Sequence, residues 1–196
     1  MTICGFAKTR DGSAFVWADG EAYRDSEPLS AKVVKLGVSP SGLCGISTGY
    51  FDLSERFRKT IEGFGAQFDF AVRRLPETLR FARAWKVKRC RELEISYESP
   101  TNYAVAGWSG DTVRGAVFYE SRDFEAVEAD AWFSPSIEAE PQNAEDVLAT
   151  AQRQLKVVQR SIPAATGRDL TVAKIGPTGV AVAVVPLLIK GSNDLL

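Results

Sequence analysis

Short apolar runs separated by turn residues fill the N-terminal part of the chain. Residues 2–7 and 14–18 lie on either side of Asp11-Gly12, a dipeptide typical of tight hairpins. Residues 32–38 and 42–48 form a second pair, joined by a turn of Ser, Pro and Gly. The pattern therefore predicts two β-hairpins before any helix.

The spacing of apolar residues then changes to three or four positions. Leu53, Phe57 and Ile61 predict an amphipathic helix, with Asp52 in the position of an N-terminal cap. Further helices are predicted over residues 68–88 and 143–160.

Strand patterns return after the second helix and again after the third. They cover residues 102–108, 115–120, 126–133, 170–175 and 180–188. Residues 180–185 are apolar on both faces, so both faces should be covered by other layers. We therefore expect an α+β fold, a four-layer αββα sandwich of two stacked sheets with helices outside; a three-layer α/β fold is the alternative. Since no linker or repeat divides the chain, residues 1–196 should form one domain.

Histidine is absent from a chain whose composition is otherwise that of a globular protein, with 45% hydrophobic residues and a net charge of -1. Its absence excludes Ser-His-Asp and Cys-His catalysis and histidine metal sites within this chain. We expect neither a metal nor an organic cofactor. The nearly balanced charge gives no general attraction to nucleic acid.

The cysteines, Cys4, Cys44 and Cys90, are odd in number and form no C-x-x-C pair. We expect buried, reduced thiols, which fit a cytoplasmic location. The N-terminus lacks the basic and apolar regions of a signal peptide, and the longest apolar run, residues 179–189, is too short to span a bilayer. No membrane association is expected.

Without histidine, a general base must be a carboxylate, a lysine or the α-amino group of the chain. An α-amino group has a pKa of about 7.7–8.0, so much of it is a free base near neutral pH. A threonine at the first mature position can use its own amine in this way. Thr2 follows Met1 directly and becomes the N-terminus when the initiator methionine is removed.

A series of short motifs resembles the family of proteasome β-type subunits and the bacterial HslV peptidase. In order, the motifs are Thr2-Ile3, Asp11-Gly12, Ala18-Asp19-Gly20-Glu21-Ala22, the segment 30–36, Gly45-Ile46-Ser47-Thr48-Gly49, and the runs 105–108, 115–119 and 131–134. The resemblance covers nearly the whole chain. It implies the N-terminal-nucleophile (Ntn) hydrolase fold, which is an αββα sandwich, and a threonine-type peptidase activity.

The resemblance also implies a role for each matching residue. Thr2, once Met1 is removed, is the nucleophile, and its amine is the base. Lys32 lies beside Thr2 and lowers the pKa of its hydroxyl and amine, while Asp19 pairs with Lys32. The Gly49 N–H stabilises the oxyanion, and Ser134 matches a serine near the nucleophile. The implied reaction is hydrolysis of peptide (amide) bonds through an acyl-enzyme.

Two departures from the family pattern favour an alternative. Ser134 is followed by Pro135 where the family has a Gly-Ser-Gly turn, and Pro163 stands where the family has an aspartate. The alternative is a catalytically inactive proteasome-like subunit with an assembly or binding role.

Charges are unevenly distributed along the chain. Basic side chains crowd residues 73–91, and acidic ones crowd residues 120–146. Because proteasome-type subunits assemble in rings, we expect a homo-oligomer, a ring in which the basic stretch lies near an acidic patch of a neighbour or of the chain's own later half. The expected substrate is a peptide, and whether an ATPase partner delivers it is left open.

Overall fold

The computed structural model describes residues 2–21, 33–65, 67–97, 100–165 and 169–187, with the backbone alone for residues 23–24 and 27–28. The helices are α1 (Phe51–Glu62), α2 (Phe68–Glu92) and α3 (Ala144–Gln159), with a 3-10 turn η1 (Glu120–Arg122). The strands are β1 (Cys4–Lys8), β2 (Ala14–Asp19), β3 (Tyr23–Arg24), β4 (Glu27–Pro28), β5 (Gly37–Val38), β6 (Cys44–Ser47), β7 (Tyr103–Ser109), β8 (Thr112–Phe118), β9 (Ala126–Glu128), β10 (Ala131–Ser134), β11 (Asp169–Gly176) and β12 (Gly179–Pro186).

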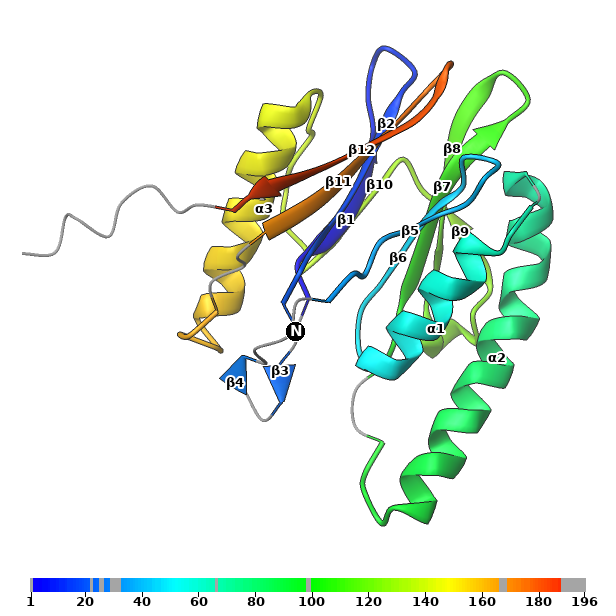
Figure 1. Cartoon of the computed structure of the whole chain (residues 1–196), viewed down its shortest axis with the longest axis vertical. Coiled ribbons are helices and arrows are strands. Elements are labelled where there is room, and N and C mark those ends of the chain that lie inside the picture. Colours follow the sequence, from blue (N-terminus) through cyan, green and yellow to red (C-terminus); the bar gives the residue numbers. More distant parts are fainter. Residues whose placement is uncertain are drawn as a thin grey trace, which may run out of the picture.

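Two five-stranded antiparallel sheets organise the described chain (Figure 1). The first sheet has the strand order β10-β1-β2-β11-β12, and the second has the order β5-β6-β7-β8-β9. The predicted hairpin around Asp11-Gly12 is confirmed, with Cys4 opposite Ala18. The second hairpin is also confirmed, although its first strand is only Gly37–Val38. This is a mixed α+β structure, and no parallel ladder occurs in the described part of the chain.

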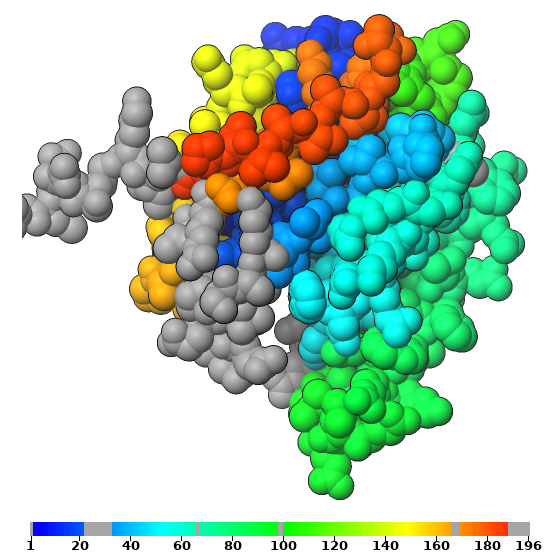
Figure 2. All heavy atoms as spheres, in the orientation of Figure 1, coloured from blue at the N-terminus to red at the C-terminus, as the bar shows by residue number. Residues whose placement is uncertain are grey.

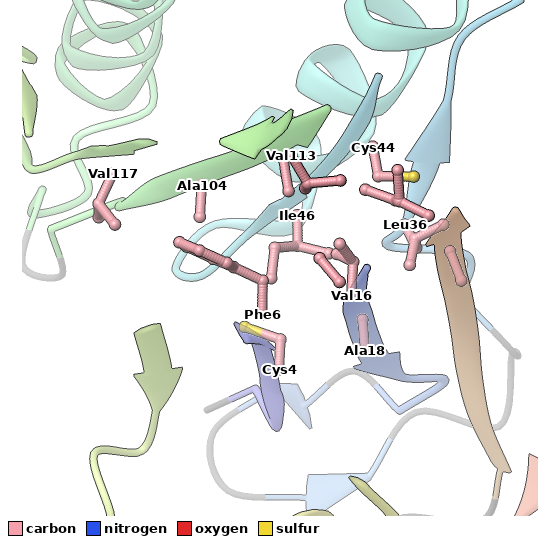
Figure 3. Packing of buried hydrophobic residues seen from close by; sticks show 14 residues of the cluster. Cys4, Phe6, Val16, Ala18, Leu36, Cys44, Ile46, Ala104, Val113 and Val117 are labelled. Atoms are coloured by element: carbon pink, nitrogen blue, oxygen red, sulfur yellow. The ribbon is translucent and has the colours of Figure 1, made fainter. Parts of the chain in front are cut away.

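The inner faces of the two sheets pack against each other through small and branched apolar side chains. Figure 3 shows Phe6 and Val16 of the first sheet directed toward Ile46 and Val113 of the second. Gly115 makes room for the aromatic ring, since a Cβ at this position would lie 2.2 Å from Phe6 Cε2. A larger residue at position 115 would therefore push the sheets apart.

Helices cover the outer faces of both sheets. On the first sheet, Trp17 packs with Ala151 and Leu155 of α3. On the second sheet, Phe118 packs with residues of α1 and α2 such as Phe57. The layers thus run α3, first sheet, second sheet, and then α1 with α2 (Figure 1).

The predicted helices exist, but one predicted cap is wrong. α3 begins after Asn143, whose side chain accepts a hydrogen bond of 2.9 Å from the Asp146 N–H. α1 begins after Tyr50, and Asp52 lies inside the first turn, where it forms an ion pair with Lys86. Asp52 therefore links two helices instead of capping one. Across the described ranges, no helix combines the length and apolar character needed to cross a membrane.

The prediction of one strand over residues 126–133 is wrong. The chain leaves the second sheet after β9 and enters the first sheet as β10. At the crossing, the Ala129 N–H donates to the Gly115 carbonyl, and the Asp130 carbonyl accepts from the Lys8 N–H. Ala129 and Asp130, whose partners lie in different sheets, thus separate what the sequence pattern predicts as one strand.

The prediction that other layers cover both faces of residues 180–185 is also wrong. β12 is an edge strand and lies on the surface, as the orange-to-red spheres of Figure 2 show. Val182 and Val184 are 51% and 56% exposed. Their branched side chains favour a strand, but the position of β12 at the sheet edge leaves them uncovered.

The expected proximity of the basic stretch to the chain's own acidic half is observed. Arg80 Nε lies 2.7 Å from Asp123 Oδ2, and Arg83 Nε lies 3.0 Å from Glu120 Oε1. These pairs join α2 to the η1 region within one molecule.

Candidate active site

A buried ion pair lies where β2 ends. Lys35 Nζ is 2.7 Å from Asp19 Oδ1, and the side chains of Lys35 and Asp19 are only 5% and 1% exposed. The same carboxylate oxygen accepts a 3.2 Å hydrogen bond from the Ile3 N–H. The pair is therefore hydrogen-bonded to Ile3, the residue that directly follows Thr2. Thr2 is itself buried.

Backbone pairing explains how these side chains meet. The Asp19 N–H donates to the Ile3 carbonyl, which extends the β1–β2 ladder toward the N-terminus. The Val33 N–H donates to the Gly20 carbonyl, so the chain passes beside the end of β2 again. Val33 and Lys35 are buried while Val34 between them is exposed, as expected for three residues in extended backbone, and Leu36 is buried in turn. This alternation directs Lys35 inward to Asp19.

The electrostatics of the pair are dominated by its removal from water. Burial raises the pKa of the Asp19 carboxyl, and the Lys35 ammonium opposes that shift. Nearby Glu21, also buried, contributes in the same direction as burial. Asp19 Oδ2 is buried without a hydrogen-bond partner among the described residues. Burial likewise raises the pKa of the Cys4 thiol, so Cys4 is a neutral core residue at neutral pH.

Gly49 lies in the bend between β6 and α1. Its φ of +96° is in the left-handed region that favours glycine. A Cβ here would lie 2.5 Å from Thr101 Oγ1 and 2.9 Å from Thr101 Cα, so position 49 is closed to larger residues on two grounds. In Figure 1, β6 leads into α1 at the same end of the molecule as the N-terminus and the end of β2.

Ser134 is the last residue of β10 and lies opposite Cys4 in the first sheet. A buried glutamine secures this corner. Gln154 of α3 donates to the carbonyls of Cys4 and Pro135 at 2.9 and 3.2 Å and accepts from Trp17 Nε1 at 3.0 Å. The first strand, the chain after Ser134 and α3 are thus held together near residue 2.

The candidate residues therefore fall into three groups. Thr2 and Asp19 are linked through Ile3, and the β1–β10 ladder brings Ser134 to the same end of the first sheet. Gly49 lies at the end of a strand of the second sheet. Lys32 lies outside the described residues; among the described lysines, Lys35 contacts Asp19.

Sequence reasoning missed Lys35 and Gln154. No local signal marks Lys35, because it stands between exposed Val34 and buried Leu36 and its own side chain is polar. Gln154 follows Ala151 by three positions, on the apolar face of α3. A polar residue on such a face is a signal for a buried hydrogen-bonding role.

Surface hollows that are lined wholly by described residues include three with volumes of about 250, 400 and 430 Å³. They lie against Arg114, against Arg83 and against Pro177, and none of the three is lined by Thr2, Asp19 or Lys35. Within the part of the chain that the structure describes, no three Cys, Asp or Glu side chains are grouped to hold a metal ion.

No protein-family model matches the chain, and no curated protein sequence matches it either. A threonine that directly precedes a backbone N–H bound to a buried lysine–carboxylate pair can carry nucleophilic chemistry if the threonine supplies its own amine as base.

Proposed function

We propose that the chain is a proteasome-like Ntn hydrolase that cleaves peptide (amide) bonds, with Thr2 as its nucleophile after removal of Met1. The observation that carries the proposal is the buried Asp19–Lys35 pair, bonded to the residue after Thr2. In this proposal Lys35 takes the role that the motif order assigns to Lys32. The layer order of helix, two stacked sheets and helices supports the Ntn-hydrolase αββα fold.

The proposed reaction needs a neutral amine on Thr2. The Lys35 ammonium lowers the pKa of that amine by charge proximity, and Asp19 holds Lys35 in place. The amine accepts the proton of the Thr2 hydroxyl as Oγ attacks the carbonyl carbon of the substrate. The Gly49 N–H stabilises the oxyanion that forms. The same proton passes to the leaving nitrogen as the C–N bond breaks, and water then hydrolyses the ester on Thr2.

The wider setting belongs to the same proposal. A threonine peptidase with reduced thiols suits the cytoplasm. Assembly into a homo-oligomeric ring would limit access to peptides, as in the family that the motifs resemble. Arg80 and Arg83 already pair with acidic residues of their own chain, and both side chains are still partly exposed to a neighbour.

Intact mass and covalent labelling test the proposal directly. We expect the purified protein to lack Met1 and to gain the mass of one peptide β-lactone on Thr2, a reagent that acylates N-terminal threonine. Thr2→Ala should abolish both labelling and hydrolysis of fluorogenic peptides. Retention of Met1 with no labelling would overturn the proposal and favour the inactive subunit that Pro163 suggests.

Separate lysine variants decide which cation acts. We expect Lys35→Met to remove hydrolysis, with circular dichroism checking that the fold persists. Lys8→Met is the matched control, because Lys8 pairs with exposed Asp130. Lys32→Met completes the set: loss of activity there, with retention in Lys35→Met, would return the role to Lys32.

A further inference from the structure

Glu120 is a carboxylate with three donors around it. Its side chain is only 8% exposed. Oε2 accepts hydrogen bonds of 2.8 Å from the Tyr97 hydroxyl and of 2.8 Å from the Thr101 N–H. Arg83 Nε lies 3.0 Å from Oε1. Both carboxylate oxygens are therefore bound, and Glu120 fixes the backbone at Thr101.

Thr101 in turn lies directly against Gly49. The closest atoms to a Cβ at position 49 would be Thr101 Oγ1 and Cα. The neighbouring residues are bonded as well, since the Thr48 N–H donates to the Asn102 carbonyl at 2.9 Å and the Asn102 N–H donates to Thr48 Oγ1 at 3.3 Å. Any shift of residues 101–102 therefore moves the bend that contains Gly49.

Aromatic and ionic contacts hold the other side of the bend. Tyr50 stacks on Tyr97 with 5.1 Å between ring centroids. Lys86 Nζ lies 4.3 Å from the centroid of the Tyr50 ring and 2.9 Å from Asp52 Oδ2. Tyr97 thus contacts both Glu120 and the residue that follows Gly49. The bend is held from the two sides by one connected network.

We propose that Glu120 is a positioning residue that fixes the Gly49 amide for oxyanion stabilisation. This inference rests on the proposed function, because it names what orients a donor of that site. An oxyanion donor acts through its preset position, and a displacement of about 1 Å can lower the rate a hundredfold. Both oxygens of Glu120 are already bound within the chain, so in this proposal its effect reaches the reaction through residues 101–102 and Gly49.

The first test needs no substrate and follows the Gly49 amide in Glu120→Gln by NMR. A glutamine keeps the shape but turns an NH₂ group toward one of the donors. We expect a changed chemical shift and faster hydrogen exchange at Gly49 and Thr48. Asp123→Asn is the matched control, because Asp123 pairs with the same Arg83 but does not contact Thr101. Unchanged Gly49 signals in folded Glu120→Gln would overturn the proposal.

The second test measures peptide hydrolysis by the full chain. We expect Glu120→Gln to lower kcat by roughly ten- to a hundredfold with KM within about twofold, since the substrate contacts persist. The pH profile should keep its shape, because the Thr2 amine is untouched. Tyr97→Phe retains the carboxylate and should show a smaller effect of the same kind. A rise in KM with unchanged kcat would overturn the positioning role.

The two tests separate this inference from the function on which it rests. If the Gly49 amide responds but wild-type protein is never acylated on Thr2, the proposed function is wrong and the catalytic role of Glu120 falls with it. If Thr2 is acylated and the Gly49 amide ignores Glu120→Gln, the function stands and the positioning role is wrong.

Discussion

Asp19 and Glu120 are both carboxylates shielded from water, and both bind a cation at close range, but their remaining partners differ. Glu120 has donors on both oxygens, from Tyr97, Thr101 and Arg83. Asp19 receives Lys35 and the Ile3 N–H on one oxygen, while its other oxygen is buried without a partner among the described residues.

The difference separates a carboxylate whose oxygens are both bonded from one that keeps an unbonded oxygen, as the proposed role of Asp19 in the site would favour. A fully bonded carboxylate recovers the solvation that it loses on burial. An incompletely bonded one lowers stability, and such groups gather at functional sites. The two cations also differ in exposure to water. Lys35 is 5% exposed and depends on Asp19 for its solvation, whereas Arg83 is 44% exposed and reaches water.

The largest expected effect is the loss of stability in Lys35→Met. Removing Lys35 leaves Asp19 as an uncompensated buried charge, which lowers the free energy of unfolding by about 3–5 kcal/mol. Urea denaturation at pH 7 measures the change. In the double variant Asp19→Asn/Lys35→Met, most of the loss should be recovered because no charge stays buried. A double variant as unstable as Lys35→Met would show that packing of the lysine stem, and not charge, is responsible.

The pH dependence of stability distinguishes Asp19 further. Its pKa is raised in the folded state by burial, above the ordinary value of 3.8. The folded protein therefore binds the proton more tightly than the unfolded chain, and this contribution is complete below pH 3.8 and lost as pH rises through the folded pKa. Asp19→Asn lacks the group, so wild type should lose stability relative to this variant as pH rises. A difference that stays constant from pH 3 to about pH 8, in parallel urea titrations, contradicts the raised pKa.

The same change of cation at the other carboxylate should matter less. In Arg83→Met, Glu120 keeps the hydrogen bonds from Tyr97 and Thr101. Water can reach its other oxygen through the space that the arginine head group leaves. Since Arg83 is 44% exposed, we expect a loss of only about 1 kcal/mol, measured by urea denaturation beside Lys35→Met. Equal losses in the two variants would remove the distinction between the two sites.

Features that depend on a few neighbouring residues were predicted correctly from the sequence. Features that depend on how the sheets and layers pack were not. The hairpin at Asp11-Gly12 follows from turn chemistry within a few residues. Residues 126–133 read as one strand because nothing in their composition says that β9 and β10 pair in different sheets. Val182 and Val184 read as covered because branched apolar residues give no sign of an edge position.

In the candidate site too, residues in local motifs were predicted and residues with distant partners were missed. Motif order led to Asp19 and to the segment that contains Lys35, but the contact of Lys35 with Asp19 depends on which face this segment turns inward. Glu120 and Gln154 were missed because their partners are distant in sequence, as with Gln154 and Trp17, which are 137 positions apart. Such contacts depend on how the elements pack, so the local order of polar and apolar residues hardly reveals them.

The smallest expected change in stability follows substitution of Asp123. This residue pairs with Arg83, as Glu120 does, but its side chain is exposed to solvent. Asp123 pairs with Arg80 at 2.7 Å and with Arg83 at 4.0 Å, and its side chain is 63% exposed. Exposed pairs contribute about 0–1 kcal/mol and weaken as salt screens them. Asp123→Asn should therefore lower stability by less than about 0.5 kcal/mol, and 1 M NaCl should abolish the difference. We expect a larger loss of stability in Glu120→Gln that persists in the same salt, because the Glu120 side chain is only 8% exposed and the Thr101 N–H that it binds is buried. Salt that abolished both losses would place Glu120 with the surface charges and not with the buried ones.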